Sequence, residues 1–101
     1  MTQNENWMII AIEECSEVQK ELSKIMRFGL NNYNPFDPLK ITNEENFLEE
    51  YYQLQVVIEY MQKLELVQTL SDKEIDEIKK CKIENVIQYM NKSIELGIVK
   101  N

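Results

Sequence analysis

The chain has 101 residues, of which 44% are apolar and 29% charged, and its formal net charge is −7. This composition predicts one cytoplasmic domain over residues 1–101. The acidic balance argues against a nucleic-acid polymer as partner, and the lack of a run of about 18 apolar residues argues against a membrane. The chain has no histidine, which excludes a Ser-His-Asp triad and a Cys-His nucleophile pair.

The first predicted helix runs from about residue 6 to residue 28, with Gly29 as its left-handed terminator. Glu14 falls inside the apolar face of this helix, and Glu17 and Glu21 lie towards the edge of that face. A buried carboxylate is costly unless it is paired or bound to a cation, so Glu14 is a candidate metal ligand. The apolar face itself consists of Trp7, Ile10, Ala11, Val18, Leu22 and Ile25.

A loop over residues 31–38 follows, because this stretch is rich in asparagine, aspartate and proline. A capping box at residues 42–45 then predicts a second helix, which runs to about residue 64. Glu50 lies near the centre of its apolar face, so this helix also carries a misplaced carboxylate. The apolar residues of that face are Phe47, Leu54, Val57, Ile58, Met61 and Leu64.

A second capping box, Ser71 with Glu74, predicts a third helix that ends near Gly97. Lys79 and Lys82 lie within its apolar face, so they either extend into solvent or direct an ammonium at the acidic residues or at a ligand phosphate. We therefore expect an all-α fold, a three-helix chain whose bundle is completed by oligomerisation as a homodimer or homotetramer. The apolar residues of that face of the third helix are Ile75, Ile78, Val86, Tyr89 and Met90.

Acidic and amide side chains recur at i+3 and i+4 spacing on the first two helices, which puts them on one side of each helix. Oxygen donors without nitrogen or sulfur favour Mg²⁺ or Mn²⁺ over Zn²⁺, and such a site suits attack by a metal-activated water on a phosphate anhydride. The alternative interpretation is that these residues are the solvated acids of ordinary helices. The residues concerned are Glu13, Glu14, Glu17, Asn46, Glu49, Glu50 and Gln53.

Basic and aromatic residues form a second candidate set. Lys24 and Lys82, together with Arg27, would neutralise a triphosphate, or else would pair with neighbouring glutamates. The aromatic side chains in or near the loop would fill the core or a subunit interface, or one or two of them would stack on a nucleobase. They are Phe28, Tyr33, Phe36, Tyr51 and Tyr52.

Cys15 and Cys81 are expected to be free thiols.

Several segments of the chain follow the pattern of one known family. Residues 13–17 read Glu-Glu-Cys-Ser-Glu, residues 23–29 read Ser-Lys-Ile-Met-Arg-Phe-Gly, and residues 47–54 read Phe-Leu-Glu-Glu-Tyr-Tyr-Gln-Leu. In these segments, and in its tail at residues 79–84 and 95–97, the chain resembles MazG-like all-α nucleoside triphosphate pyrophosphohydrolases of the short, phage type. Members of that family cleave between the α and β phosphates and release a nucleoside monophosphate and pyrophosphate.

The resemblance implies a site for Mg²⁺ or Mn²⁺. Glu14, Glu17 and Glu50 would be its metal ligands, and Glu13 would help to position water or metal. Lys24, Arg27, Lys79 and Lys82 would then be candidates for binding the substrate, a nucleoside triphosphate.

The chain departs from the family at Gln53, where the family has an aspartate. A glutamine can give a metal one neutral oxygen but no charge, so metal affinity or water activation should fall. Glu49, one turn earlier, is expected to compensate, whereas Asn46 would add only another neutral oxygen. Two other interpretations stay open: a nucleotide-binding protein that has lost turnover, and a helical adaptor whose acids are all solvated.

Overall fold

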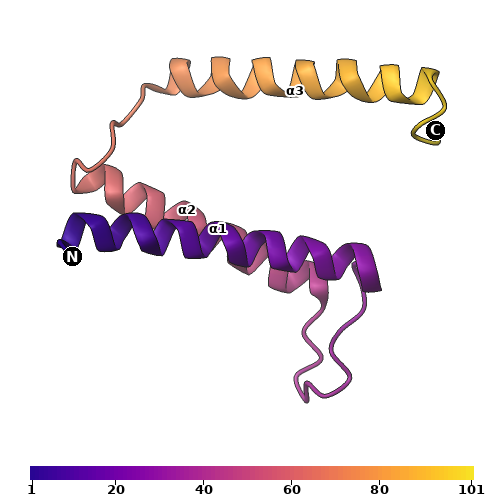
Figure 1. Cartoon of the computed structure of the whole chain (residues 1–101), viewed down its shortest axis with the longest axis horizontal. Helices are drawn as coiled ribbons and strands as arrows, with labels where there is room; N and C mark the ends of the chain where they lie inside the picture. The colour runs from indigo at the N-terminus through magenta and orange to yellow at the C-terminus, as the bar shows by residue number, and fades with distance from the viewer. The chain divides into compact units, whose positions relative to one another are not determined.

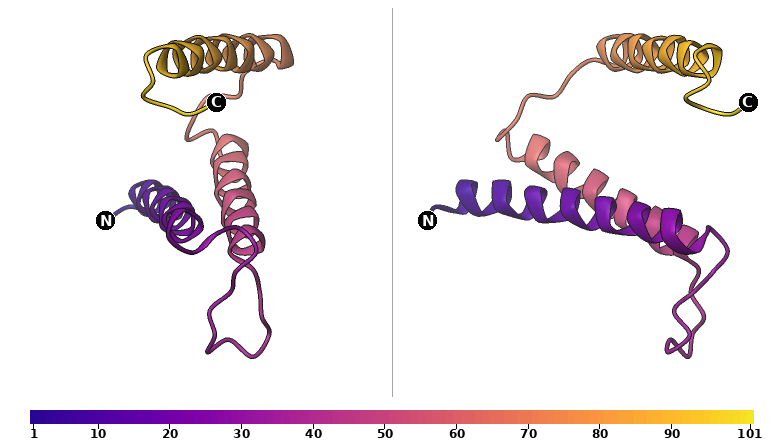
Figure 2. Two further views of the ribbon diagram at one scale, coloured as in Figure 1. Left: turned by 90° about the vertical axis from the view of Figure 1, so that its right-hand side faces the viewer. Right: turned by 45° about the vertical axis from the view of Figure 1, so that its right-hand side comes forward.

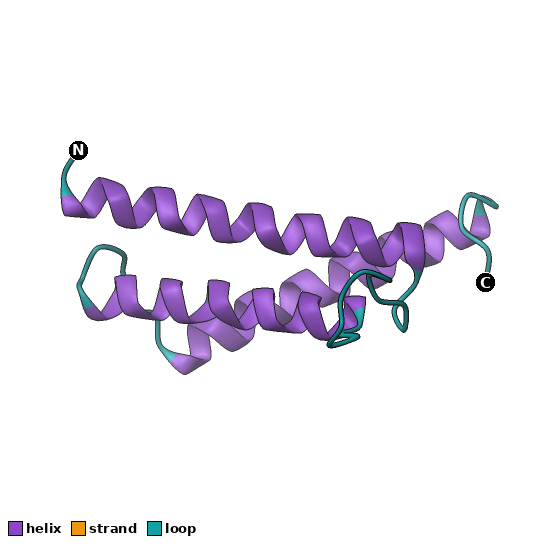
Figure 3. Ribbon diagram, turned by 90° about the horizontal axis from the view of Figure 1, so that it is seen from below, coloured by secondary structure: helices purple, strands orange, loops and turns teal.

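The computed structural model describes all 101 residues and consists of three helices joined by loops, without a strand (Figure 3). Helix α1 spans Gln3–Phe28, α2 spans Asn43–Lys63 and α3 spans Asp72–Glu95. The prediction of an all-α chain with three helices is therefore confirmed. None of the three helices combines the length and the apolar character needed to cross a membrane.

The chain divides into two compact units, and each is described by itself. The first unit, Met1–Gln68, contains α1 and α2, and the second, Thr69–Asn101, contains α3. The single domain over residues 1–101 stays a prediction.

Helix α1 starts earlier than the sequence analysis placed it, because Thr2 is its N-cap. The hydroxyl of Thr2 accepts a hydrogen bond from the backbone N–H of Glu5 at 3.1 Å, and the Glu5 carboxylate accepts one from the N–H of Thr2 at 3.2 Å. This reciprocal pair satisfies two N–H groups that the first turn of a helix leaves free. At the other end Gly29 has a φ of 93°, and its N–H donates to the carbonyl of Ile25 at 2.8 Å.

The predicted caps of α2 and α3 are present at Thr42 and Ser71. The Thr42 hydroxyl accepts a hydrogen bond from the N–H of Glu45 at 3.1 Å, but the returning half of the predicted capping box does not form. At Ser71 both halves form with Glu74. The starts of all three helices are thus set by residues three apart in the sequence.

Helices α1 and α2 lie side by side and antiparallel (Figures 1 and 2). At one end of the pair the rings of Trp7 and Tyr60 have centroids 5.2 Å apart. At the other end the buried side-chain amide of Asn43 donates to the carbonyl of Gly29 at 3.0 Å. The start of α1 therefore contacts the end of α2, and the loop connects the two neighbouring ends.

The seam between α1 and α2 follows a regular spacing of three and four residues, as in coiled-coil packing. Met61 is its most buried apolar side chain, with 2% of its surface exposed. Leu22, expected in the seam, is exposed, and Glu21 is buried instead. The reason is helical geometry, since Glu21 follows Glu14 by seven residues, almost two full turns. The seam residues are Trp7, Ala11, Glu14, Val18, Glu21 and Ile25 on α1, and Asn43, Phe47, Glu50, Leu54, Val57 and Met61 on α2.

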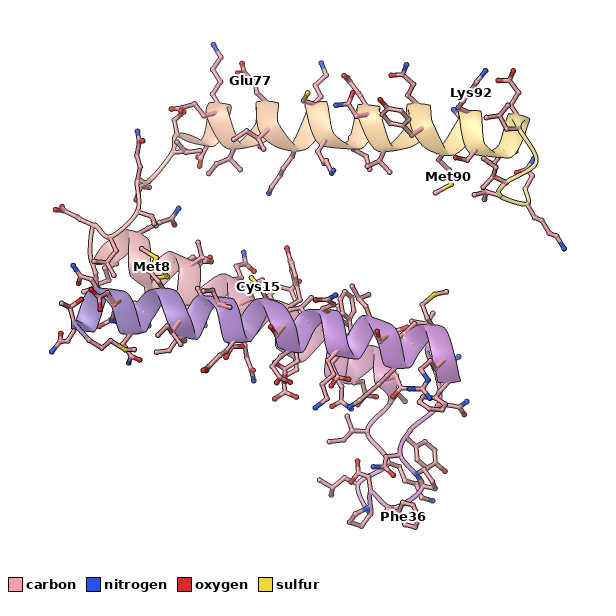
Figure 4. All side chains as sticks on the ribbon, in the orientation of Figure 1. Met8, Cys15, Phe36, Glu77, Met90 and Lys92 are labelled. Carbon is pink, nitrogen blue, oxygen red and sulfur yellow. The ribbon has the colours of Figure 1, made fainter.

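Side chains of the loop itself fix its backbone. Asn34 accepts a hydrogen bond from the N–H of Phe36 at 3.0 Å, and the Asp37 carboxylate accepts from the N–H groups of Leu39 at 2.9 Å and Ile41 at 3.3 Å. Such bonds between an Asx side chain and the backbone two residues on are typical of ordered turns. Phe36 lies at the far tip of the loop and is 92% exposed (Figure 4).

Helix α3 is amphipathic, and most of its apolar side chains are exposed. Met90 extends from one side of the helix, and Glu77 and Lys92 extend from the other (Figure 4). Ile75 and Ile94 are half-buried. The exposed apolar side chains of α3 are Ile78, Ile83, Val86, Ile87, Tyr89 and Met90.

We predict that Met61→Ala lowers the free energy of unfolding by about 2–5 kcal/mol, because it leaves a cavity where the seam is most buried. Leu39→Ala is the control, since Leu39 lies in the loop and is 76% exposed, and it should change the free energy by no more than about 0.5 kcal/mol. Urea unfolding followed by circular dichroism measures both values. Equal losses in the two variants would show that the seam is not the core of this unit.

Candidate functional site

Carboxylates gather in the middle of the α1–α2 seam. Burial raises the pKa of Glu50 above its ordinary value of 4.5, and the negative charges of Glu14, Glu17, Glu21 and Glu49 raise it further. Like charges act in this way only when they are near one another. We call these five residues the acidic cluster; three of them lie on α1, and Glu49 and Glu50 lie on α2.

The acidic cluster is poorly compensated by its surroundings. One oxygen of Glu14 and one of Glu21, both Oε2, are buried without a hydrogen-bond partner. Leaving a buried polar atom unpaired costs about 1–3 kcal/mol, and more when the group is charged. The only cation paired with the cluster is Lys24, whose Nζ lies 3.1 Å from Glu21 Oε1. Because this lysine is 40% exposed, the pair contributes no more than about 1 kcal/mol and does not offset that cost.

The donor chemistry of the cluster fits a hard divalent cation. No three histidine, cysteine, aspartate or glutamate side chains are arranged to form a metal site, so a completed ligand set is not present. The available donors are nevertheless carboxylate oxygens, two of them buried and unpartnered, and Mg²⁺ and Mn²⁺ bind such oxygens. The residues thus match a hard cation in donor type, charge and burial.

The structure brings together some of the predicted metal-site residues and separates others. Glu14 and Glu17 are half-buried on the side of α1 that faces Glu50. Glu13 is exposed. Gln53 is also exposed, and its Nε2 donates a hydrogen bond of 3.4 Å to Glu49 Oε1. The two residues considered as the fourth donor therefore contact each other at the surface.

The predicted substrate-binding cations are also spread over the structure. Lys24 lies beside the acidic cluster. Arg27 is exposed, and its guanidinium carbon lies 5.3 Å from the ring centre of Phe28, within the range of a cation–π contact. Lys79 and Lys82 lie on α3 in the second unit, where both are exposed. Their roles towards a phosphate stay predictions.

A cavity of about 370 Å³ lies between the end of α1, the loop and the start of α2. Lys24, which is also the ion-pair partner of Glu21, is part of its wall, so the cavity adjoins the acidic cluster. Phe28 and Tyr33 give it two aromatic side chains, and Asn46 gives it an amide. The other residues around it are Asn32, Asn34, Pro35, Asp37, Ile41 and Asn43.

Several polar groups around the cavity are already held by internal hydrogen bonds. The side-chain amide of Asn32 donates to the carbonyl of Phe28, and that of Asn43 donates to the carbonyl of Gly29. These bonds fix the end of α1 against the start of α2. The cavity wall is therefore ordered before a ligand arrives, which lowers the entropy cost of binding.

Sequence reasoning missed two parts of this site. Glu21 was placed at the edge of the apolar face, although its spacing of seven residues from Glu14 puts both on one line along the helix. The cavity was missed because Asn32 and Asn34 were interpreted only as turn residues. No local pattern shows that this loop and the ends of two helices will line one cavity.

In comparisons with known proteins, no family model matches the chain, and no curated protein or solved structure gives a significant match. The resemblance of its motifs to the MazG-like enzymes therefore stays a prediction. Any functional assignment depends on the residues and geometry described above.

We predict that Glu50→Gln makes the protein more stable at neutral pH when a chelator is present. A raised pKa means that the folded state holds the proton more tightly than the unfolded state. The stability from this proton is complete below pH 4.5 and is lost as the pH rises through the folded-state pKa. The parent should therefore lose stability above pH 4.5, and Glu50→Gln should lose less.

Urea unfolding from about pH 4 to about pH 7 tests this difference. Glu59→Gln, which removes the same charge from an exposed position on α2, should follow the parent. If Glu50→Gln and the parent share the same pH dependence, Glu50 does not experience the charges of the other carboxylates.

Proposed function

We propose that this protein is a hydrolase of nucleoside triphosphates that depends on Mg²⁺ or Mn²⁺ and releases a nucleoside monophosphate and pyrophosphate. This is the activity of the MazG-like enzymes that its motifs resemble. One observation carries the proposal: Glu14 and Glu17 lie across the seam from Glu50. In addition, the Oε2 atoms of Glu14 and Glu21 are buried without a hydrogen-bond partner. A protein gains nothing in stability from this arrangement, so a bound cation is the simplest reason for it.

The carboxylates of Glu14, Glu17 and Glu50 would hold the cation. When bound, the cation would lower the pKa of a coordinated water, so that the hydroxide formed could attack a phosphate anhydride, and it would neutralise charge on the phosphates. All three carboxylates are half-buried in the seam, and this partial loss of contact with water strengthens their attraction for a cation. Gln53 would add at most a neutral oxygen, and Glu13 would act from the exposed side of α1.

The cavity beside the cluster is suited to the nucleoside part of the substrate. Its volume of about 370 Å³ lies within the range of about 300–1,000 Å³ that is common for small-molecule sites. Phe28 and Tyr33 offer aromatic surfaces for stacking on a base, and Asn46 offers both a donor and an acceptor. Lys24 lies between this cavity and the carboxylates, where a phosphate chain would pass.

A homodimer or homotetramer working in the cytoplasm is the assembly that we propose. A second, interrupted apolar stripe lies on α1 beside the seam, each of its residues following a seam residue by one position, and apolar side chains of α3 are also exposed. Exposed apolar surface of this extent commonly marks an interface, and a second copy would complete a helical bundle. The side chains of the α1 stripe are Met8, Ile12, Leu22 and Met26.

A non-catalytic nucleotide-binding protein is the second candidate. The observation in its favour is that Gln53, at the place of the family's aspartate, is exposed and hydrogen-bonded to Glu49. Such a protein would bind a nucleoside triphosphate with metal but would release no pyrophosphate. Binding and turnover measured on the same sample distinguish the two candidates.

A screen of nucleoside triphosphates with Mg²⁺ or Mn²⁺, with pyrophosphate release as the readout, should find at least one substrate. We predict that Glu14→Gln and Glu50→Gln each lower its turnover by about 10- to 100-fold or more, because each loses a charged metal ligand. Circular dichroism should show intact helices in both variants, and Glu59→Gln should keep the parent rate. Parent-like turnover in both ligand variants would contradict the assigned ligands, and a parent that neither binds nor cleaves any nucleotide would contradict both candidate functions.

We predict that Tyr33→Leu weakens nucleotide binding by about fivefold or more, since stacking on a base contributes about 1–3 kcal/mol. Phe36→Leu is the matched control, because Phe36 is in the same loop but lies outside the cavity wall and is 92% exposed. Inorganic triphosphate, which has no base, should bind both variants as it binds the parent. If Tyr33→Leu weakens inorganic triphosphate and nucleotides equally, the cavity does not hold the base.

A further inference from the structure

Glu21 is the only buried charged residue of the chain, with 6% of its surface exposed. The other buried polar residue of the chain, Asn43, has a hydrogen-bond partner in Gly29. In Glu21, by contrast, only Oε1 is paired, with Lys24, and the buried Oε2 has no partner. Only one oxygen of this buried carboxylate is therefore paired. The other lacks the cation or hydrogen-bond donor that a buried carboxylate needs.

Glu21 is the member of the acidic cluster that lies furthest along α1, one helical turn beyond Glu17. Glu21 follows Glu17 by four residues, so both side chains project from the same side of α1. Its charge acts on Glu50 across the seam, as do those of Glu14 and Glu17. The Glu21 end of the cluster adjoins the cavity, because its partner Lys24 is part of the cavity wall.

We propose that Glu21, with Glu17 one turn before it and Glu50 across the seam, binds a divalent cation at the end of the acidic cluster nearest the cavity. This proposal depends on the proposed function and adds the Glu21 carboxylate to the metal ligands of that site. Glu21 replaces the charge that Gln53 lacks, and it does so from α1 instead of α2. Glu49 is less suited to this role, because it is exposed and its Oε1 accepts the hydrogen bond from Gln53.

Lys24 is the counter-ion that such a cation displaces. Its ammonium lies 3.1 Å from Glu21 Oε1, where it competes for the same carboxylate. The lysine side chain is 40% exposed, so it is free to turn away from Glu21. Since Lys24 is also part of the cavity wall, the released ammonium stays close enough to pair with a phosphate of the bound nucleotide.

Mn²⁺ titrations of the full chain without nucleotide test this proposal through affinity and stoichiometry. We expect Glu21→Gln to lose one binding event or to weaken Mn²⁺ binding by about tenfold or more, and Glu59→Gln to stay within about twofold of the parent. Glu49→Gln removes a nearby charge but no ligand, so it should weaken binding less than Glu21→Gln does. Lys24→Met should bind Mn²⁺ several-fold more tightly, because it removes the competing ammonium. An ion pair with a purely structural role would give no such gain in affinity.

The outcomes separate this proposal from the proposed function. If Glu14→Gln loses Mn²⁺ while Glu21→Gln binds it as the parent does, the metal site stands and the role of Glu21 is wrong. A loss in Glu49→Gln with none in Glu21→Gln assigns the extra ligand to α2 and also overturns the proposal. Unchanged or weaker Mn²⁺ binding in Lys24→Met contradicts the exchange of cations, and this result holds even if Glu21→Gln fails to fold. A parent that binds no Mn²⁺ overturns both proposals.

Discussion

The repulsion between glutamates in the α1–α2 seam is the constraint on which the rest of the structure depends. Packing along this seam needs apolar side chains at intervals of three and four residues, yet Glu14, Glu21 and Glu50 occupy three of these positions. A leucine at each of these positions would contribute about 1.5–3 kcal/mol through burial. A glutamate there gives up this contribution and adds the cost of bringing a charge into the seam. The seam is therefore a compromise between a stable helical pair and a strongly negative site.

The most buried of the apolar contacts that balance this repulsion lie towards one end of the pair. Met61 is the only fully buried apolar side chain, and Trp7 packs against Tyr60 near the same end. At the loop end, hydrogen bonds take over this role, with the amide of Asn43 joined to Gly29. The acidic cluster lies between these two fixed ends, where the helices hold it in place without neutralising it.

The loop gives this negative site a second, less charged surface. Its backbone is held by the side chains of Asn34 and Asp37, so Tyr33 keeps its place in the cavity wall. A negative cluster beside an ordered cavity with aromatic walls suits a ligand that has both a negatively charged part and a planar part. Such a ligand needs a cation between its own negative charges and the carboxylates of the cluster. Lys24 pairs with Glu21 of the cluster and also forms part of the cavity wall, which places it where the two parts of such a ligand would meet.

The sequence by itself determined the helices, because local signals set their limits: Thr42 and Ser71 cap α2 and α3, and Gly29 ends α1. It also predicted that Glu14 and Glu50 lie inside apolar faces, since helical periodicity depends only on spacing. Only the tertiary structure decided which neighbours these carboxylates meet. The burial of Glu21 in place of Leu22 depends on the side that α1 turns towards α2, and the cavity depends on how the loop meets the ends of the two helices. Both are set by contacts between residues far apart in the chain, which no local pattern of residues encodes.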